Sequence, residues 1–301
     1  MRRLALAGLL LAGPPPAATQ EAPRPLVFAA HVESVFIDAF VSRNGASISG
    51  LTASDFALKD NGSPQTFDLI PVDSVPIRAV LVFDTSSSMS GAKLDQLRAA
   101  AQSFLGELRP LDEAALVSFS DRVVWLSPLS PDLDQVRRAL SSLQAQGATA
   151  MYDALFAALA IPQSASRTLV ILFSDGQDTM SWLRAADLRR LVRRANALIH
   201  VVAARSEERG SRAPIAANTK SADLNELREL AQITGGSLIE VRSPEHIEAA
   251  FTRIIEDMKN RYVLRYTPAT ERAAGWHKLE IRLRSRQGRV RGRSGYWVEG
   301  R

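Results

Sequence analysis

The stretch IRAVLVFDTSSSMSG, residues 77–91, carries most of the information about the fold, because an apolar run ends in an aspartate and a cluster of hydroxyls. The apolar run is typical of a buried strand. Three interpretations explain why Asp84 and residues 85–88 follow a strand directly. The stretch could be a capped turn before a helix, a serine or aspartate nucleophile with a base or metal nearby, or an oxygen shell for a hard cation such as Mg2+ or Ca2+. The rest of the chain decides between these interpretations.

The pattern around this stretch predicts a doubly wound α/β domain over residues 76–260. Short apolar runs alternate there with amphipathic helical patterns. Strands that are apolar on both faces belong to a mostly parallel sheet with helices on both sides. The apolar runs are AVLVF, AALVSF, TLVILF, LIHVVAA and SLIEV, and the helical patterns include KLDQLRAAAQSFLGEL and PEHIEAAFTRIIEDM.

Two short β segments flank this domain, at residues 26–75 and 261–298. In the first segment, VESVFIDAFVS alternates with period two, and Asn44-Gly45 and Asn61-Gly62 are turn signals. Neither segment is long enough to bury a core of its own. We therefore expect the two segments to pair into one sheet or sandwich, which forms a small β domain.

Arginines alternate with other residues on both sides of Gly288, which predicts a hairpin with its arginines on one face. A solvated outer face and a binding surface for an anionic surface or acidic partner are the two interpretations of this pattern. The arginines are Arg282, Arg284, Arg286, Arg289, Arg291 and Arg293.

The opening sequence MRRLALAGLLLAGPPPAATQEAP is typical of a secretory signal, with two arginines, about ten apolar residues and a Pro/Ala-rich stretch. The predicted signal peptide covers residues 1–18, with cleavage near Ala18. No later segment is apolar over the roughly 20 residues that a membrane span needs. The expectation is a secreted or periplasmic protein.

Composition excludes several classes of site and partner. The chain has no cysteine, which excludes a disulfide framework, a thiolate zinc site and a cysteine nucleophile. Removal of residues 1–18 leaves 35 Lys and Arg against 32 Asp and Glu, a net charge of +3. That charge is too small to indicate a nucleic-acid partner.

Three loops of the predicted domain carry oxygen ligands to the same edge of the sheet. In open α/β sheets, ligands bind beyond the carboxyl ends of the strands. Asp84, Ser86 and Ser88 follow one predicted strand, Asp175 follows another, and Thr149 immediately precedes a helix. Two carboxylates and three hydroxyls at one edge would form a small cage of hard oxygen ligands.

These motifs resemble the metal-ion-dependent adhesion site of von Willebrand factor type A domains. The resemblance rests on DTSSS at residues 84–88, the threonine in GATA at 147–150 and the Ser-Asp-Gly that contains Asp175. The flanking DFALKDNGSPQTF and YVLRYTP, together with LAQITGGSLIEV, are similar to segments of the bacterial "VWFA-related" family. The Gly-Ala-Thr loop departs from many relatives, which have two glycines before the threonine.

The resemblance implies a divalent cation held directly or through water by Asp84, Ser86, Ser88, Thr149 and Asp175. Mg2+ is the expected metal, with Mn2+ or Ca2+ as alternatives. It also implies that a partner protein supplies an Asp or Glu carboxylate to the metal. The predicted function is metal-dependent binding of another protein, in adhesion or assembly.

Two other functions remain as alternatives, a structural or assembly factor whose metal site is unused and a metal-dependent hydrolase. An enzyme is not expected, because the chain has no G-x-S-x-G motif and no histidine beside a catalytic acid. Its histidines, which are interpreted as ordinary core-edge or surface residues, show no metal-ligand spacing. They are His31, His200, His246 and His277.

Overall fold

The computed structural model of the 301-residue chain describes residues 34–161, 167–175, 178–204, 214–268, 273–284 and 287–299. Within residues 214–223 it describes the backbone only. The predicted signal peptide, residues 1–18, lies outside the described residues. The same holds for Arg286.

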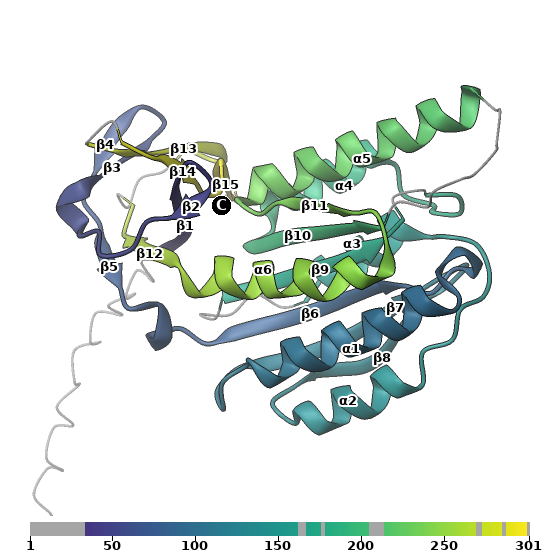
Figure 1. The fold of residues 1–301 in the computed structure, drawn as a ribbon. Coiled ribbons are helices and arrows are strands. Elements are labelled where there is room, and N and C mark those ends of the chain that lie inside the picture. Colours follow the sequence, from purple (N-terminus) through teal and green to yellow (C-terminus); the bar gives the residue numbers. More distant parts are fainter. Residues whose placement is uncertain are drawn as a thin grey trace, which may run out of the picture. The chain divides into compact units, whose positions relative to one another are not determined.

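A six-stranded sheet forms the centre of the α/β domain, which lies between the two flanking segments in the sequence (Figure 1). Its strand order is β11-β10-β9-β6-β7-β8. Five of its strands are parallel, and β8 pairs antiparallel with β7 at the edge. Strands β6 and β9 are buried along nearly their whole length, as strands covered on both faces must be. The strands are β6 (Ile77–Asp84), β7 (Glu113–Phe119), β8 (Val123–Ser130), β9 (Arg167–Ser174), β10 (Ala197–Ala204) and β11 (Leu238–Val241).

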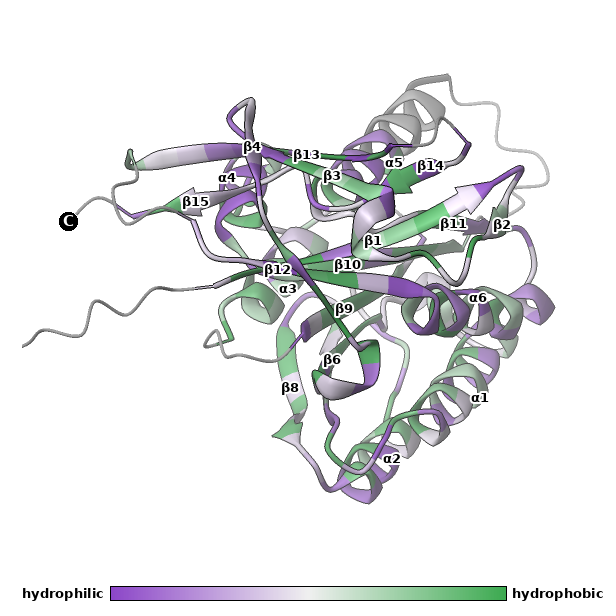
Figure 2. Ribbon diagram, turned by 90° about the vertical axis from the view of Figure 1, so that its left-hand side faces the viewer, coloured by the Kyte–Doolittle hydropathy of each residue, from purple (hydrophilic) through white to green (hydrophobic). Residues whose placement is uncertain are grey.

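Helices cover both faces of this sheet, and each face has its own hydrophobic core. One core contains residues of α1 (Ala92–Gly106), α2 (Leu133–Ser141) and α6 (Ile247–Lys259). The other contains residues of α3 (Met151–Leu159), α4 (Ala185–Arg194) and α5 (Pro214–Thr234). In Figure 2, α1 and α6 carry both hydrophobic and hydrophilic residues around their circumference, as expected of helices that cover a sheet. The predicted doubly wound α/β fold is confirmed.

Strand β8 was not identified from the sequence. Its residues, VVWLSPLS, lack a regular alternation, and the pairing of β8 with β7 shifts register twice. An edge strand needs to bury less of its surface than a central one, and it tolerates a proline such as Pro128. The signal for β8 is therefore weaker than the signal for its neighbours.

The flanking segments form two further sheets, and each sheet contains strands from both ends of the chain. One sheet has the order β14-β1-β12-β5, with β2 paired to β1, and the other has the order β15-β13-β3-β4. The amino-terminal strands are β1 (Val35–Arg43), β2 (Ala46–Ser47), β3 (Phe56–Asp60), β4 (Ser63–Gln65) and β5 (Asp68–Ile70). The carboxyl-terminal strands are β12 (Arg261–Tyr266), β13 (Gly275–Leu283), β14 (Arg289–Arg291) and β15 (Gly295–Val298). A shared core from both flanks includes Ile37, Leu58 and Leu264.

The predicted hairpin around Gly288 is wrong. Strand β13 pairs with β3 and β15, whereas β14 crosses to the other sheet and pairs with β1. Arg282, Arg284 and Arg289 are exposed, but Arg291 and Arg293 are only partly exposed. The arginines therefore do not share one solvated face. The alternation of residues along the chain could not show that the two halves join different sheets.

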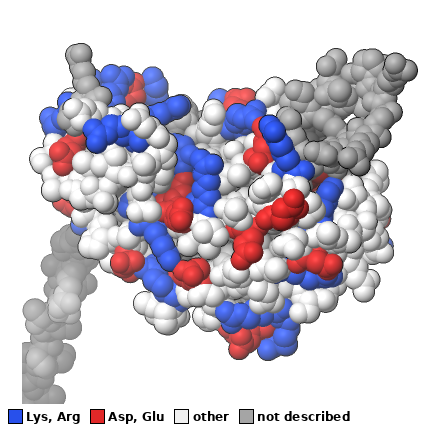
Figure 3. Space-filling view, viewed as in Figure 1, with Lys and Arg blue, Asp and Glu red and all other residues white. Residues whose placement is uncertain are grey.

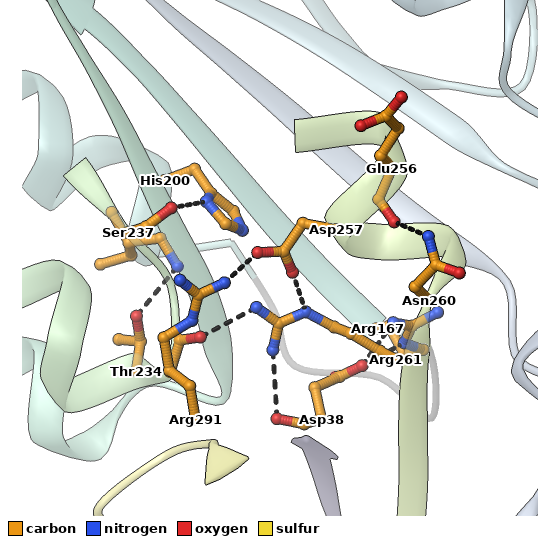
Figure 4. Close-up of polar contacts among 12 residues, drawn as sticks. Asp38, Arg167, His200, Thr234, Ser237, Glu256, Asp257, Asn260, Arg261 and Arg291 are labelled. Atoms are coloured by element: carbon orange, nitrogen blue, oxygen red, sulfur yellow. Dashed lines mark hydrogen bonds and ion pairs between the residues drawn. The ribbon is translucent and has the colours of Figure 1, made fainter. Parts of the chain in front are cut away.

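A cluster of buried charges joins the carboxyl-terminal flank to the α/β domain (Figure 4). Arg261, whose side chain is fully buried, donates from Nε to Asp257 Oδ1 of α6 at 2.7 Å. Its two terminal nitrogens donate to the carbonyl oxygens of Asp38 in β1 at 3.1 Å and of Gly235 at 2.8 Å. Arg291 of β14 binds the other oxygen of Asp257. One carboxylate thus forms ion pairs with two arginines of the flank.

A second set of contacts joins the flank to α4. Arg293 donates to the Asn196 side chain at 2.5 Å and to the carbonyl oxygen of Ala195 at 3.4 Å, both just after α4, and to Gly295 O within the flank at 2.8 Å. The guanidinium of Arg194 lies 4.7 Å from the ring centre of Trp297, which is a cation–π contact. These contacts explain why Arg293 is withdrawn from solvent.

Candidate metal centre

The carboxyl edge of the central sheet brings the predicted loops together. Strands β6 and β9 are parallel neighbours, with Phe83 opposite Phe173, so Asp84 and Asp175 follow them at the same edge. The loop after β6 is tied to the loop before α3, because Gln146 N donates to Thr85 O at 2.7 Å. Ser87 N donates to Gly147 O in the same loop at 3.1 Å.

A chain of hydrogen bonds connects four of the five predicted ligands. Ser86 N donates to Asp84 Oδ1 at 2.8 Å, and the hydroxyls of Ser86 and Ser88 lie 3.0 Å apart. The Ser88 hydroxyl donates to Asp175 Oδ2 at 2.8 Å. The other oxygen of Asp84 accepts a hydrogen bond from the Ser174 hydroxyl at 2.8 Å. Both carboxylates are therefore held in one connected polar cluster.

Thr149 lies in the adjoining loop and is 6% exposed. Its hydroxyl is not hydrogen-bonded to any of the other four predicted ligands. Its backbone is fixed instead, since Thr149 N donates to the Thr179 hydroxyl at 3.0 Å and Thr149 O accepts from the amides of Thr179 and Met180 at 2.9 and 3.0 Å. The structure thus brings Asp84, Ser86, Ser88 and Asp175 into direct contact and places the loop of Thr149 against theirs.

Burial gives Asp84 unusual electrostatics. The residue is 0% exposed, and burial raises the pKa of its carboxyl to about 6. Hydrogen bonds from Ser86 and Ser174 oppose the shift, whereas the neighbouring Asp175 carboxylate adds to it. Two carboxylates this close repel each other when both are ionised. A cation between them would offset that repulsion.

The donor set fits a hard divalent cation. Carboxylate and hydroxyl oxygens are the ligands that Mg2+ and Ca2+ prefer, and a softer metal would be expected to recruit histidine or cysteine. Within the ranges that the structure describes, no group of three or more His, Cys, Asp or Glu side chains could hold a metal. A metal at this edge would thus depend on the serine and threonine hydroxyls as well as on the two aspartates.

Gly147 has a backbone conformation that favours glycine, with φ +80°. A Cβ at this position would lie 2.8 Å from Asp121 Oδ1. The geometry of the Gly-Ala-Thr loop therefore requires glycine at its first residue. The alanine at the second position, Ala148, does not change this requirement.

Two aspartates outside the predicted set position the loop that follows Asp175. Asp178 Oδ2 accepts hydrogen bonds from Tyr152 N at 2.9 Å and from the Ser181 hydroxyl at 2.6 Å. Asp153 accepts hydrogen bonds from the amides of Trp182 and Leu183, both at 3.0 Å. Sequence reasoning missed both residues. The position of Asp153 in the first turn of a predicted helix was the available signal, since aspartate there is favourable.

Comparison with known proteins agrees with this fold. A family model described as "von Willebrand factor type A domain" matches residues 79–177. Inter-alpha-trypsin inhibitor heavy chain H4 of Bos taurus is 29% identical over 138 residues, which are 41% of this chain and 15% of that protein. The corresponding protein of Sus scrofa is 31% identical over 134 residues, 40% of this chain and 14% of that protein. The chain thus spans only about a seventh of the length of these relatives.

A solved von Willebrand factor type A structure from Catenulispora acidiphila has the same fold, with a TM-score of 0.50 and 18% identity. The match covers 75% of this chain and 50% of that one. The five candidate ligands all fall within residues 79–177, the range of the family model. Residues 79–177 therefore match the von Willebrand factor type A domain, and the central α/β domain that contains them has the fold of a solved type A structure.

Proposed function

We propose that this chain is a non-enzymatic module that binds another protein through a divalent cation held at the candidate metal centre. The observation that carries the proposal is the hydrogen-bonded cluster of Asp84, Ser86, Ser88 and Asp175 at the carboxyl edge of the sheet. Type A domains are typically protein-interaction and adhesion modules, which supports the same function.

The residues of the centre would hold the cation and leave it with enough positive charge to bind an anionic group. Asp84 and Asp175 would supply the negative charge, and Ser86, Ser88 and Thr149 would supply neutral oxygens. When bound, Mg2+, Mn2+ or Ca2+ would offer a coordination position to an Asp or Glu carboxylate of the partner. The hydrogen bond from the Ser174 hydroxyl to Asp84 Oδ2 would keep the buried Asp84 carboxylate in place at the carboxyl edge of the sheet.

We further propose a secreted or periplasmic location, on the basis of the predicted signal peptide. Among the helices that the structure describes, none is both long and apolar enough to cross a membrane. Positive and negative side chains are interspersed on the face shown in Figure 3. On this face the charges do not form the concentrated basic surface that nucleic-acid binding requires.

Calorimetric titration of the chain with Mg2+, Mn2+ and Ca2+ tests this proposal. We expect wild type to bind at least one of these cations and Asp84→Ala to lose binding, because the substitution removes a buried anionic ligand. Asp95→Ala is the matched control, since Asp95 is an exposed aspartate on α1 whose side chain is 72% accessible. Its metal binding should equal that of wild type.

The titration also separates the proposal from its alternatives. If wild type binds none of the three cations, the DTSSS stretch is a capped turn and the chain is better explained as a structural or assembly factor. Equal binding by Asp84→Ala and wild type would place the metal elsewhere and would contradict the assigned ligands.

A further inference from the structure

The loop from Asp178 to Leu183 is fixed beside the candidate metal centre. Its amides at Thr179 and Met180 both donate to Thr149 O, the backbone of a predicted ligand. Farther along, the amides of Trp182 and Leu183 donate to the Asp153 carboxylate in the first turn of α3. The loop is thus bonded at both ends to the segment that carries Thr149.

Within this fixed loop, two large apolar side chains face solvent. Trp182 is 95% exposed and Met180 is 51% exposed. Phe156, which follows Asp153 by one turn of α3, is 44% exposed. These three residues are half of the large hydrophobic residues that are exposed in the described part of the chain, the others being Leu111, Val124 and Trp125. We call Met180, Trp182 and Phe156 the apolar rim.

The hydrogen bonds of the loop fix the backbone from which Met180 and Trp182 project. The amides of Trp182 and Leu183 are held by the Asp153 carboxylate, and the Trp182 side chain is exposed on this fixed backbone. Exposed tryptophan retains unfavourable contact with water, and tryptophan is among the residues that contribute most to binding when a partner covers it. A rigid aromatic side chain also loses little conformational freedom on binding.

We propose that the apolar rim binds a large apolar side chain that lies next to the metal-binding carboxylate of the partner. The inference rests on the proposed function, because the carboxylate and the apolar side chain would be read by adjacent surfaces. The Met180 amide donates to the carbonyl oxygen of Thr149, so the backbone that carries Met180 borders the loop of a predicted metal ligand. The partner segment therefore contains an Asp or Glu that binds the metal and a Trp, Phe, Leu or Met within a few residues of it.

A selection from a random 12-residue peptide library displayed on phage tests this inference. The full chain is immobilised with millimolar Mg2+, and bound phage are eluted with EDTA. We expect the eluted peptides to contain an acidic residue with a large apolar residue within three positions. A synthetic peptide of that consensus should bind Trp182→Ser at least about 10-fold more weakly than wild type, as expected for a residue that dominates an interface.

Leu111→Ser is the matched control, because Leu111 is 77% exposed but lies just before β7, at the opposite edge of the sheet from the metal centre. Its peptide affinity should equal that of wild type. The melting temperature of Trp182→Ser should also be unchanged, since a side chain that is 95% exposed contributes little to folding.

The outcomes separate this inference from the proposed function. Eluted peptides that share an acidic residue but no apolar neighbour would overturn the apolar rim and leave metal-dependent binding intact. A library that yields no EDTA-eluted peptide would count against both. Binding of the chain to phosphatidylcholine–phosphatidylglycerol vesicles that is lost in Trp182→Ser, without any peptide preference, would assign the rim to a membrane and overturn the inference.

Discussion

Asp257→Asn is expected to destabilise the whole protein, because this buried residue forms ion pairs with two arginines. Asp257 is 7% exposed, and Arg261 and Arg291 bind its two oxygens. Burial alone would raise the pKa of Asp257, but the two arginines outweigh burial and hold that pKa below its ordinary value. The carboxylate is therefore ionised at neutral pH, and asparagine would leave both cations without their counter-charge.

The expected magnitude follows from the burial of this cluster. Removing one partner of a buried ion pair costs about 3–5 kcal/mol, because the remaining charge stays buried without compensation. For a chain of this size, each kcal/mol corresponds to about 2–4 °C in melting temperature, so the expected decrease is about 6–20 °C. Thermal unfolding followed by circular dichroism measures it directly.

Asp95→Asn provides the control for that measurement. Asp95 forms an ion pair with Arg98 on α1, but its side chain is 72% accessible. A pair this exposed contributes about 0.5 kcal/mol or less, so the melting temperature should change by about 2 °C at most. Equal, small decreases for Asp257→Asn and Asp95→Asn would refute the argument that the buried charge cluster holds the flank in place.

Three further predictions concern packing, pH and catalysis. Gly236→Ala should cost about 3 kcal/mol or more in urea unfolding, because its Cβ would lie 1.8 Å from Ile199 O; Gly106→Ala, with nothing within 4 Å, should be neutral or stabilising. Burial lowers the pKa of His200 to about 3, so the contribution of the neutral imidazole to the free energy of unfolding is fully present above pH 6.5. Below that pH the free energy of unfolding should fall by about 1.4 kcal/mol per pH unit, a loss of about 2 kcal/mol at pH 5. The difference between wild type and His200→Gln across pH 5–8 isolates this contribution, and parallel stability curves would contradict it. Purified protein should show no metal-dependent hydrolysis of esters or phosphoesters that Ser86→Ala removes, and turnover lost in that variant would favour an enzyme instead.

The candidate site was largely accessible from the sequence because its geometry follows from a rule of the fold. Parallel strands that are apolar on both faces have a strong local signature, and the residues at their carboxyl ends meet at one edge. This rule predicts from the sequence alone that Asp84, Ser86, Ser88 and Asp175 lie together. The supporting aspartates Asp153 and Asp178 were not found, because their contacts join a loop without a periodic pattern to the first turn of α3.

In the carboxyl-terminal flank, the local residue pattern did not predict which strands pair or which arginines are buried. The residues around Gly288 alternate as a hairpin would, yet β13 and β14 belong to different sheets because each finds its partner in the amino-terminal flank. Arg291 and Arg293 were for the same reason expected to share the environment of Arg282. Their burial depends on α6 and Asn196, which are distant in sequence and are brought close only by the fold.

By itself the sequence determined the class of the fold and the chemical identity of its candidate ligands, since hydrophobic periodicity and strand-end motifs are local properties. Only the tertiary structure decided which charges are buried, which strands share a sheet and which side chains remain exposed. Trp182 is an example: an apolar residue is normally buried, but this one is exposed on a loop whose backbone is held by Asp153 of another element. Contacts between distant segments set such outcomes, and no local pattern of residues encodes them.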